Sequence, residues 1–183
     1  MLDVGCGAGW SSIALARGGA GVTVVGVVLD EASIADARRN AAQAGVADRV
    51  SFQLADSAAL DAGDGFDLAC IFEALHDMGD PVGALRQVRR ALREGAPLLV
   101  ADERVAEAFT APGDEVERFM YGWSVLHCLP ATRAESPKIA NGTVLRAATV
   151  RAWAHQAGFR RVQVLPIANE FWRFYRLDAH DEP

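Results

Sequence analysis

Short runs of hydrophobic residues alternate with amphipathic stretches along the first hundred residues. The short runs, each bounded by turn residues, predict buried strands. They lie at Leu2–Val4, Val22–Leu29, Val50–Leu54, Phe66–Phe72 and Pro97–Ala101. The amphipathic stretches predict helices over Trp10–Arg17, from Asp30 to Ala44 and from Asp80 to near Gly95. Strands that alternate with helices in this order form a parallel sheet that is covered by helices on both faces.

The pattern changes in the last eighty residues or so. Residues 106–142 are predicted to form an insertion, a lid over one end of the sheet, with one helix from about Asp114 to Cys128. Thr149 is expected to cap a helix that ends at Gly158. Two closing strands are expected to form an antiparallel pair at the sheet edge, Arg161–Leu165 and Phe171–Leu177. We therefore predict one α/β domain over residues 1–183, with a Rossmann-like, doubly wound, mostly parallel seven-stranded sheet and an antiparallel edge strand.

The composition is typical of a soluble globular protein, with 51% hydrophobic residues, 23% charged residues and a net charge of −6. The negative charge argues against binding to nucleic acid, and the apolar runs are too short to span a membrane. The three cysteines are far apart and form neither a disulfide framework nor a metal-ligand cluster. We expect a cytoplasmic protein that binds no metal, nucleic acid or membrane. Because the first strand begins at the initiator methionine, we expect that strand to be truncated.

A glycine-rich turn follows the first predicted strand and reads Asp3-Val4-Gly5-Cys6-Gly7-Ala8-Gly9. In open α/β sheets, ligands bind at the carboxyl ends of the strands, where glycine leaves room for a ligand or for a tight turn. A dinucleotide-binding loop needs glycine at its first, third and sixth positions. Trp10 and Ser12 occupy the sixth position in the two possible registers. The turn therefore disfavours NAD and FAD.

The segment LDVGCGAGWSSIALA resembles the first motif of class I S-adenosylmethionine-dependent methyltransferases. The resemblance implies that Asp3 orients the loop and the methionyl amine of the cofactor. It also implies that the loop residues Gly5, Cys6, Gly7 and Gly9 make room for S-adenosylmethionine and surround its methionyl part.

Two later segments continue the resemblance, and one position departs from it. Asp56 and Ser57 follow the third predicted strand, where the family has an acid that accepts a hydrogen bond from the adenine amino group. Phe72 ends the fourth predicted strand, next to the methionyl end of the cofactor. Val28 is the departure, because the family usually has an acid there that binds both ribose hydroxyls. Asp30 lies two residues further on and is either a ribose ligand or a helix cap.

Two histidines are candidates for a catalytic base. Transfer of a methyl group to a hydroxyl requires an acceptor for the proton, and histidine changes its charge in the neutral range. His76 follows the fourth predicted strand, although it can instead stabilise its loop beside Asp77. His127 lies in the predicted helix of the insertion. It shares one helical stripe, which belongs either to a substrate pocket or to the core, with Val116, Met120 and Trp123.

The insertion and the segment Phe171–Leu177 resemble a narrower group of bacterial methyltransferases that carry an amino-terminal winged-helix segment used in dimerisation. We expect a homodimer only if such a segment precedes this chain. The resemblance implies methyl transfer from S-adenosylmethionine to a small molecule, with oxygen as the favoured acceptor. The alternative is a degenerate methyltransferase that binds the cofactor or regulates without catalysis. Val28 favours this alternative, whereas the glycine loop and Asp56 favour the enzyme.

Overall fold

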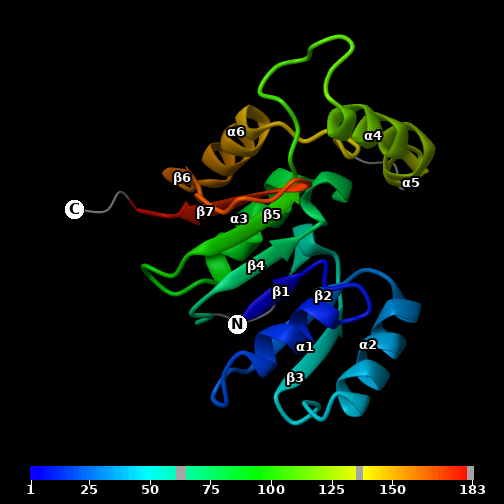
Figure 1. The fold of residues 1–183 in the computed structure, drawn as a ribbon. Coiled ribbons are helices and arrows are strands. Elements are labelled where there is room, and N and C mark those ends of the chain that lie inside the picture. The colour runs from blue at the N-terminus through cyan, green and yellow to red at the C-terminus, as the bar shows by residue number, and fades with distance from the viewer. Residues whose placement is uncertain (61–64, 135–137, 181–183) are drawn as a thin grey trace.

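The computed structural model describes residues 1–60, 65–134 and 138–180. Its centre is one seven-stranded sheet in the order β3-β2-β1-β4-β5-β7-β6 (Figure 1). The strands are β1 (Leu2–Val4), β2 (Val24–Val28), β3 (Val50–Leu54), β4 (Ala69–Phe72), β5 (Leu98–Glu103), β6 (Arg161–Val164) and β7 (Trp172–Asp178). The strands β1 to β5 are parallel, whereas β7 is antiparallel to both β5 and β6. The predicted α/β fold with a mostly parallel seven-stranded sheet is confirmed.

Helices cover the sheet and extend beyond one end of it. They are α1 (Trp10–Arg17), α2 (Glu31–Gln43), α3 (Pro81–Ala91), α4 (Glu115–Trp123), α5 (Leu129–Ala134) and α6 (Ala147–Ala157). Two short 3₁₀ helices, η1 (Ser57–Ala59) and η2 (Leu75–Asp77), follow β3 and β4, and a π-helix η3 (Ser124–Cys128) joins α4 to α5. Figure 1 places α4 and α5 together at one side of the fold, away from α1 and α2. None of the helices in the described ranges has both the length and the hydrophobicity needed to cross a membrane.

Two buried hydrophobic clusters hold the layers together. One cluster joins side chains of β1, β4 and β5 to α3 and α6, with Leu2, Leu85 and Trp153 among its members. The other joins β2 and β3 to α1 and α2, with Ile13 and Phe52 among its members. Because successive side chains of a strand point to opposite faces, the sheet contributes to both clusters, and the central strands β1, β4 and β5 are largely buried on both sides.

Helix caps that are local in sequence form as predicted. The Asp30 carboxylate accepts a hydrogen bond from the backbone N–H of Ser33 at 2.7 Å and begins α2. The Asp80 carboxylate accepts one from Gly83 at 2.9 Å and begins α3, with Pro81 in the first turn. Each cap satisfies a backbone donor that has no partner within the helix.

The predicted boundaries at Phe66 and Thr149 are wrong, for reasons that lie outside the local sequence. Phe66 does not belong to β4, because its backbone pairs with the end of α3 through a bridge to Leu92. Thr149 is not a cap, because α6 begins at Ala147 with Arg146 in the capping position. The Arg146 side chain is held by Glu117 of α4 at 2.7 Å, so a tertiary contact fixes the start of this helix.

Candidate functional site

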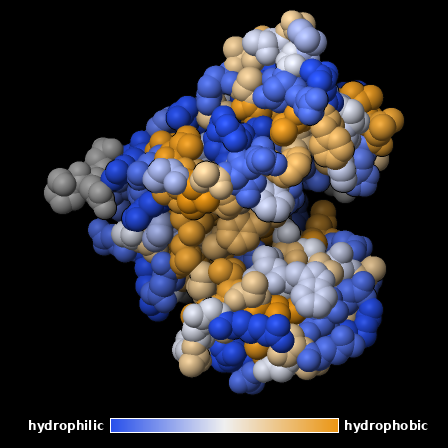
Figure 2. Space-filling view, viewed as in Figure 1, coloured by the Kyte–Doolittle hydropathy of each residue, from blue (hydrophilic) through white to orange (hydrophobic). Residues whose placement is uncertain are grey.

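Two neighbouring cavities lie at the carboxyl ends of the central strands. The larger one, of about 910 Å³, is bounded by the turns after β1, β2, β3 and β4 and is called the strand-end cavity here. The smaller one, of about 280 Å³, lies under α4 and is called the aromatic cavity. Residues 73–77 after β4 contribute side chains to both. Figure 2 shows a hollow between the part that carries α4 and α5 and the part that carries α2.

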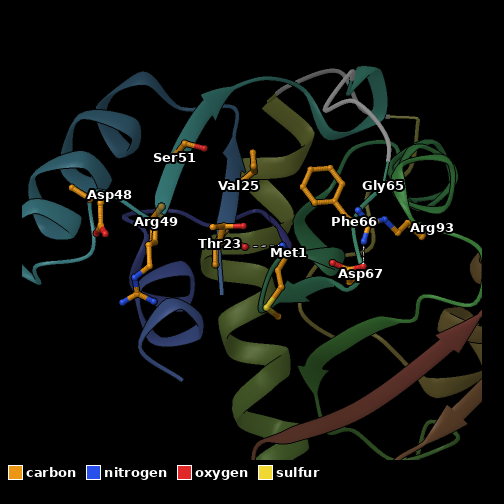
Figure 3. A pocket seen from close by; sticks show the side chains of 13 residues that line it. Met1, Thr23, Val25, Asp48, Arg49, Ser51, Gly65, Phe66, Asp67 and Arg93 are labelled. Carbon is orange, nitrogen blue, oxygen red and sulfur yellow. Dashed lines mark hydrogen bonds and ion pairs between the residues drawn. The ribbon is translucent and has the colours of Figure 1, made fainter. Parts of the chain in front are cut away.

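A third cavity, of about 410 Å³, lies at the opposite end of the sheet (Figure 3). It surrounds the start of β1, where the amino group of Met1 donates a hydrogen bond to the carbonyl of Thr23 at 2.7 Å. Asp67 and Arg93 form an ion pair at its edge. Ligands of open parallel sheets bind at the carboxyl ends of the strands, so this cavity is not the candidate site.

The turn after β1 is fixed by Asp3. The Asp3 side chain is buried, and one of its oxygens accepts hydrogen bonds from the hydroxyls of Ser11 and Ser12, both at 2.6 Å. Burial raises the pKa of Asp3, and these two hydrogen bonds oppose that rise. Asp3 therefore ties the end of β1 to the first turn of α1. It does not line the strand-end cavity.

The three glycines of the turn have different surroundings. All three have positive φ, which glycine adopts without strain. Gly5 lines the strand-end cavity, and a Cβ there would lie 2.5 Å from the Cβ of Ala74. A Cβ on Gly9 would lie 2.8 Å from the ring of Phe52, so Gly9 allows α1 and the sheet to pack closely. A Cβ on Gly7 would meet no atom within 4 Å, so the space beside this residue is open to a ligand.

Two other predicted cofactor residues do not line the strand-end cavity. Cys6 is buried in the cluster beneath α1, with its sulfur close to Gly26. Burial raises the pKa of Cys6 to about 12, so the thiol stays protonated and is inert as a nucleophile. Phe72 ends β4 and is partly buried, outside the described lining. Any role of either residue in binding remains a prediction.

Four carboxylates give the strand-end cavity a negative character. They are Asp30, Asp56, Asp77 and Asp80. The cation in the described lining is Lys138, whose amino group lies 2.6 Å from Asp80. Such a site attracts a cationic ligand with many hydrogen-bond donors and repels phosphate groups.

Two of these carboxylates combine a structural role with a free oxygen. Asp56 accepts a hydrogen bond through Oδ1 from the N–H of Ala58 at 2.8 Å, and Asp30 uses Oδ2 for its helix cap. The second oxygen of each is not used in these caps. Ser57, also predicted, lines the cavity beside Asp56, and Val28 occupies the end of β2 in the same lining.

His76 is buried among three carboxylates. Its Nδ1 lies 3.0 Å from Oδ1 of Asp102 and 2.9 Å from Oε2 of Glu103, and its Nε2 lies 3.3 Å from Oδ1 of Asp77. Burial alone would lower the pKa of His76, but the adjacent carboxylates of Asp102, Asp77 and Glu103 outweigh it and raise the pKa. The surroundings of His76 therefore favour its imidazolium form. Its predicted role as a base requires that it first lose this proton.

The π-helix moves His127 away from the cavity face. His127 is exposed and does not line either cavity. Met120 and Trp123 of the predicted stripe do line the aromatic cavity, and the next residue on that side is Cys128. In a π-turn the repeat is five residues rather than four, so Cys128 takes the position that the helical spacing gives to His127. A catalytic role for His127 remains a prediction.

The sequence analysis missed several site residues. Glu73 and Glu103 line the aromatic cavity, and Lys138 lines the strand-end cavity. Glu103 lies in a buried strand and Lys138 in the insertion, so neither has a local signal for a site. For Glu73 a signal was present, because a charged residue directly after a buried parallel strand lies at the end of the sheet where ligands bind.

The fold and the cavities together define a Rossmann-like domain with a candidate ligand site at the topological switch point. The strand order reverses between β1 and β4, and the glycine turn and the strand-end cavity lie at this point. The chain belongs to the methyltransferase domain family, whose model matches residues 1–154.

Sequence relatives with known roles are methyltransferases. The 27-O-demethylrifamycin SV methyltransferase of Amycolatopsis mediterranei (strain S699) is 38% identical over 103 residues, which cover 56% of this chain and 38% of that protein. The ubiquinone biosynthesis O-methyltransferase of Pseudomonas aeruginosa (strain LESB58) is 27% identical over 181 residues, covering 97% of this chain and 72% of that protein. The chain thus spans less than half the length of the first relative.

Solved structures share the fold. The mitomycin 7-O-methyltransferase MmcR superposes with a TM-score of 0.74 at 22% identity, over 97% of this chain and 48% of that one. The [4+2]-cyclase SpnF superposes with a TM-score of 0.66 at 25% identity, over 88% of this chain and 52% of that one. One architecture thus carries different reactions, so the reaction must be argued from the site.

Proposed function

We propose that the chain is an S-adenosylmethionine-dependent methyltransferase domain that transfers a methyl group to an oxygen of a small molecule. The observation that carries the proposal is the acidic strand-end cavity beside Gly5, at the switch point of the sheet. The family match and the O-methyltransferases among the relatives support the reaction and the acceptor atom. The net charge of −6 supports a small molecule rather than a nucleic acid as substrate.

The residues of the strand-end cavity fit this cofactor. Its volume of about 910 Å³ lies in the range of small-molecule sites. The carboxylates can accept hydrogen bonds from an adenine amino group, ribose hydroxyls and a methionyl ammonium group, and their charge suits a sulfonium. We assign Asp56 to the adenine amino group and Asp30 to the ribose, each through the oxygen that its cap leaves free. The open space beside Gly7 allows a ligand to approach the backbone.

The protein's own contribution to the reaction is alignment and exclusion of water. When bound, the cofactor supplies a methyl group that its sulfonium has already activated. The chain then has to hold the acceptor in line and keep water out. The helices α4 and α5 lie together at one side of the fold (Figure 1), and we assign them the role of a lid over the acceptor because α4 lines the aromatic cavity. His76 and His127 remain the predicted bases for the hydroxyl proton, and a homodimer remains a proposal that depends on a winged-helix segment.

A second candidate function is cofactor binding without catalysis. It is favoured by Val28, which lines the cavity at the end of β2 without offering a carboxylate to the ribose. Hydrogen bonds to a charged group contribute about 1.5–3 kcal/mol each. The missing acid can therefore weaken cofactor binding roughly 10- to 100-fold.

Calorimetric titration with S-adenosylmethionine tests the proposal. We expect the unaltered chain to bind at about micromolar concentration. Asp56→Asn keeps a helix-capping side chain but removes the charge, and it should weaken binding roughly tenfold or more. Val28→Asp should tighten binding. Asp48→Asn is the matched control, because Asp48 lies in the cavity at the opposite end of the sheet (Figure 3), and it should change nothing.

The pattern of binding decides whether the natural chain has a working cofactor site. Binding by Val28→Asp alone would count against both candidate functions, because the natural chain would then be a disabled methyltransferase that no longer binds the cofactor. No binding by either folded protein would mean that the cofactor assignment is wrong.

A further inference from the structure

The aromatic cavity has a wall of large apolar side chains that are open to solvent. Phe119 and Trp123 from α4 stack edge to face with ring centroids 5.2 Å apart, and both are about half exposed. Phe171 and Trp172, at the start of β7, line the cavity and are also exposed. Large aromatic side chains seldom gather at a surface without a partner to cover them. Their geometry suits contact with a flat ring.

Acidic side chains form the other side of the aromatic cavity. They are Glu73, directly after β4, and Glu103, at the end of β5, and His76 belongs to the same lining. No lysine or arginine belongs to the described lining. The cation His76 is already surrounded by Asp77, Asp102 and Glu103. An anionic ligand would therefore meet uncompensated like charge in this cavity.

Glu103 leaves an unsatisfied acceptor near the cavity. Nδ1 of His76 carries a single hydrogen, and that hydrogen is donated to Asp102. Oε2 of Glu103, although 2.9 Å from the same nitrogen, is buried without a hydrogen-bond partner among the described residues. A ligand that brings a hydrogen-bond donor to this side is favoured over one that brings only acceptors.

Glu73 is the acid that is best placed to meet the acceptor. Its neighbour Ala74 contacts the Gly5 turn, so Glu73 stands at the wall that separates the two cavities. Among the described residues, Glu73 is the only non-glycine residue with positive φ, at 53°. Such strain is kept where the surrounding structure fixes a side chain for a purpose. Partial burial and the nearby Glu103 raise the pKa of Glu73 to about 7, so Glu73 is mainly a carboxylate, which accepts hydrogen bonds, only above that pH.

We propose that the aromatic cavity selects an uncharged aromatic acceptor that bears a hydroxyl group, and that Glu73 orients this hydroxyl by accepting its hydrogen bond. The inference rests on the proposed methyltransferase function and names the chemical class of its acceptor. The aromatic wall binds the ring, and the acidic side excludes ring carboxylates. The position of Glu73 between the cavities turns the hydroxyl oxygen towards the strand-end cavity.

Equilibrium dialysis with two probes that share the same ring system tests this inference. Naphthalen-2-ol is uncharged at pH 7.5 and has a hydroxyl, whereas naphthalene-2-carboxylate is anionic and has no donor. Both are dialysed against the full chain with S-adenosylhomocysteine present. We expect the naphthol to bind roughly tenfold tighter or more, because like charge and an unpaired acceptor both oppose the carboxylate.

Three variants show which residue makes the selection. Glu73→Gln should reduce the ratio of the two affinities several-fold, because the naphthalene carboxylate then binds more tightly. Glu73→Ala should weaken the binding of the naphthol. Both should leave the binding of S-adenosylhomocysteine unchanged. Leu126→Ala is the control, because Leu126 is 84% exposed next to the cavity without lining it, and it should alter neither affinity.

The outcomes separate this inference from the proposed function. Equal binding of the two probes, binding of neither, or an unchanged preference in Glu73→Gln would overturn the inference. Failure of S-adenosylhomocysteine to bind in the same samples would instead count against the proposed function.

Discussion

A buried ion pair between Arg146 and Glu117 fastens α4 to the start of α6. The two charged groups are 2.7 Å apart, and the Glu117 side chain is only 2% exposed. Arg146 also donates a hydrogen bond to the hydroxyl of Tyr121 at 3.0 Å and another to the carbonyl of Ala106. The pair therefore joins three parts of the chain, of which α4 contributes side chains to the aromatic cavity.

Replacing Arg146 by methionine should destabilise the protein strongly. The change removes the cation and leaves the buried carboxylate of Glu117 without compensation. Removing one partner of a buried pair costs about 3–5 kcal/mol. In a chain of this length, 1 kcal/mol corresponds to roughly 2–4 °C, so the melting temperature should fall by roughly 6–20 °C. Circular dichroism melts and urea titrations at pH 7 measure both quantities.

Two further variants decide whether the unpaired charge is the cause. Arg118→Met removes an exposed guanidinium of α4, the helix that carries Glu117, and should change the free energy of unfolding by about 0.5 kcal/mol or less. The double variant Arg146→Met, Glu117→Met replaces the pair by apolar groups and should recover much of the loss. If the double variant is as unstable as Arg146→Met alone, the lost packing and hydrogen bonds of Arg146 explain the effect, and the reasoning from an uncompensated charge is refuted.

Three other predictions follow from the site. Gly5→Ala would place its Cβ 2.5 Å from a neighbouring alanine and should cost about 1–3 kcal/mol beyond Gly7→Ala, which meets open space, in urea titrations. Burial raises the pKa of Glu103 to about 7 from 4.5, so the native state retains a proton that the unfolded chain releases, and the free energy of unfolding should fall as pH rises from about 4.5 to 7. Glu103→Gln should make the free energy of unfolding less dependent on pH, as measured by thermal melts across the same pH range. His76→Ala or His127→Ala should lower turnover more than cofactor binding, and unchanged turnover in both would remove the histidine-base hypothesis.

Features that depend on nearby residues could be predicted from the sequence. The alternation of strands and helices, the glycine turn and the caps at Asp30 and Asp80 all arise within a few residues of the chain. Each involves a backbone requirement that a particular residue type meets locally, such as a left-handed φ at Gly5 or an acceptor for an unpaired N–H. The strand-end cavity was accessible to sequence reasoning for this reason, since it is built from turns that directly follow strands.

Features that depend on tertiary contacts could not be predicted. The capping position of α6 is occupied by Arg146 and not, as predicted, by Thr149. The side chain of Arg146 pairs with Glu117, which is distant in the sequence. The π-turn at Ser124–Cys128 shifts the helical register. In this turn the hydroxyl of Ser124 accepts a hydrogen bond from the backbone N–H of Thr143 at 3.2 Å. Regular helical spacing therefore predicts His127 on the cavity side of this helix, whereas Cys128 lines the cavity.

Both cavities are acidic, and this shared property links the two halves of the proposed reaction. The strand-end cavity has four carboxylates and one lysine in its described lining, and the aromatic cavity has Glu73, Glu103 and the carboxylates around His76. A negative site stabilises a cationic cofactor, but the same field repels an anionic acceptor a short distance away. A domain built in this way should favour acceptors that arrive uncharged and give up a proton only as the methyl group is transferred. The charge that suits S-adenosylmethionine therefore also restricts the choice of substrate.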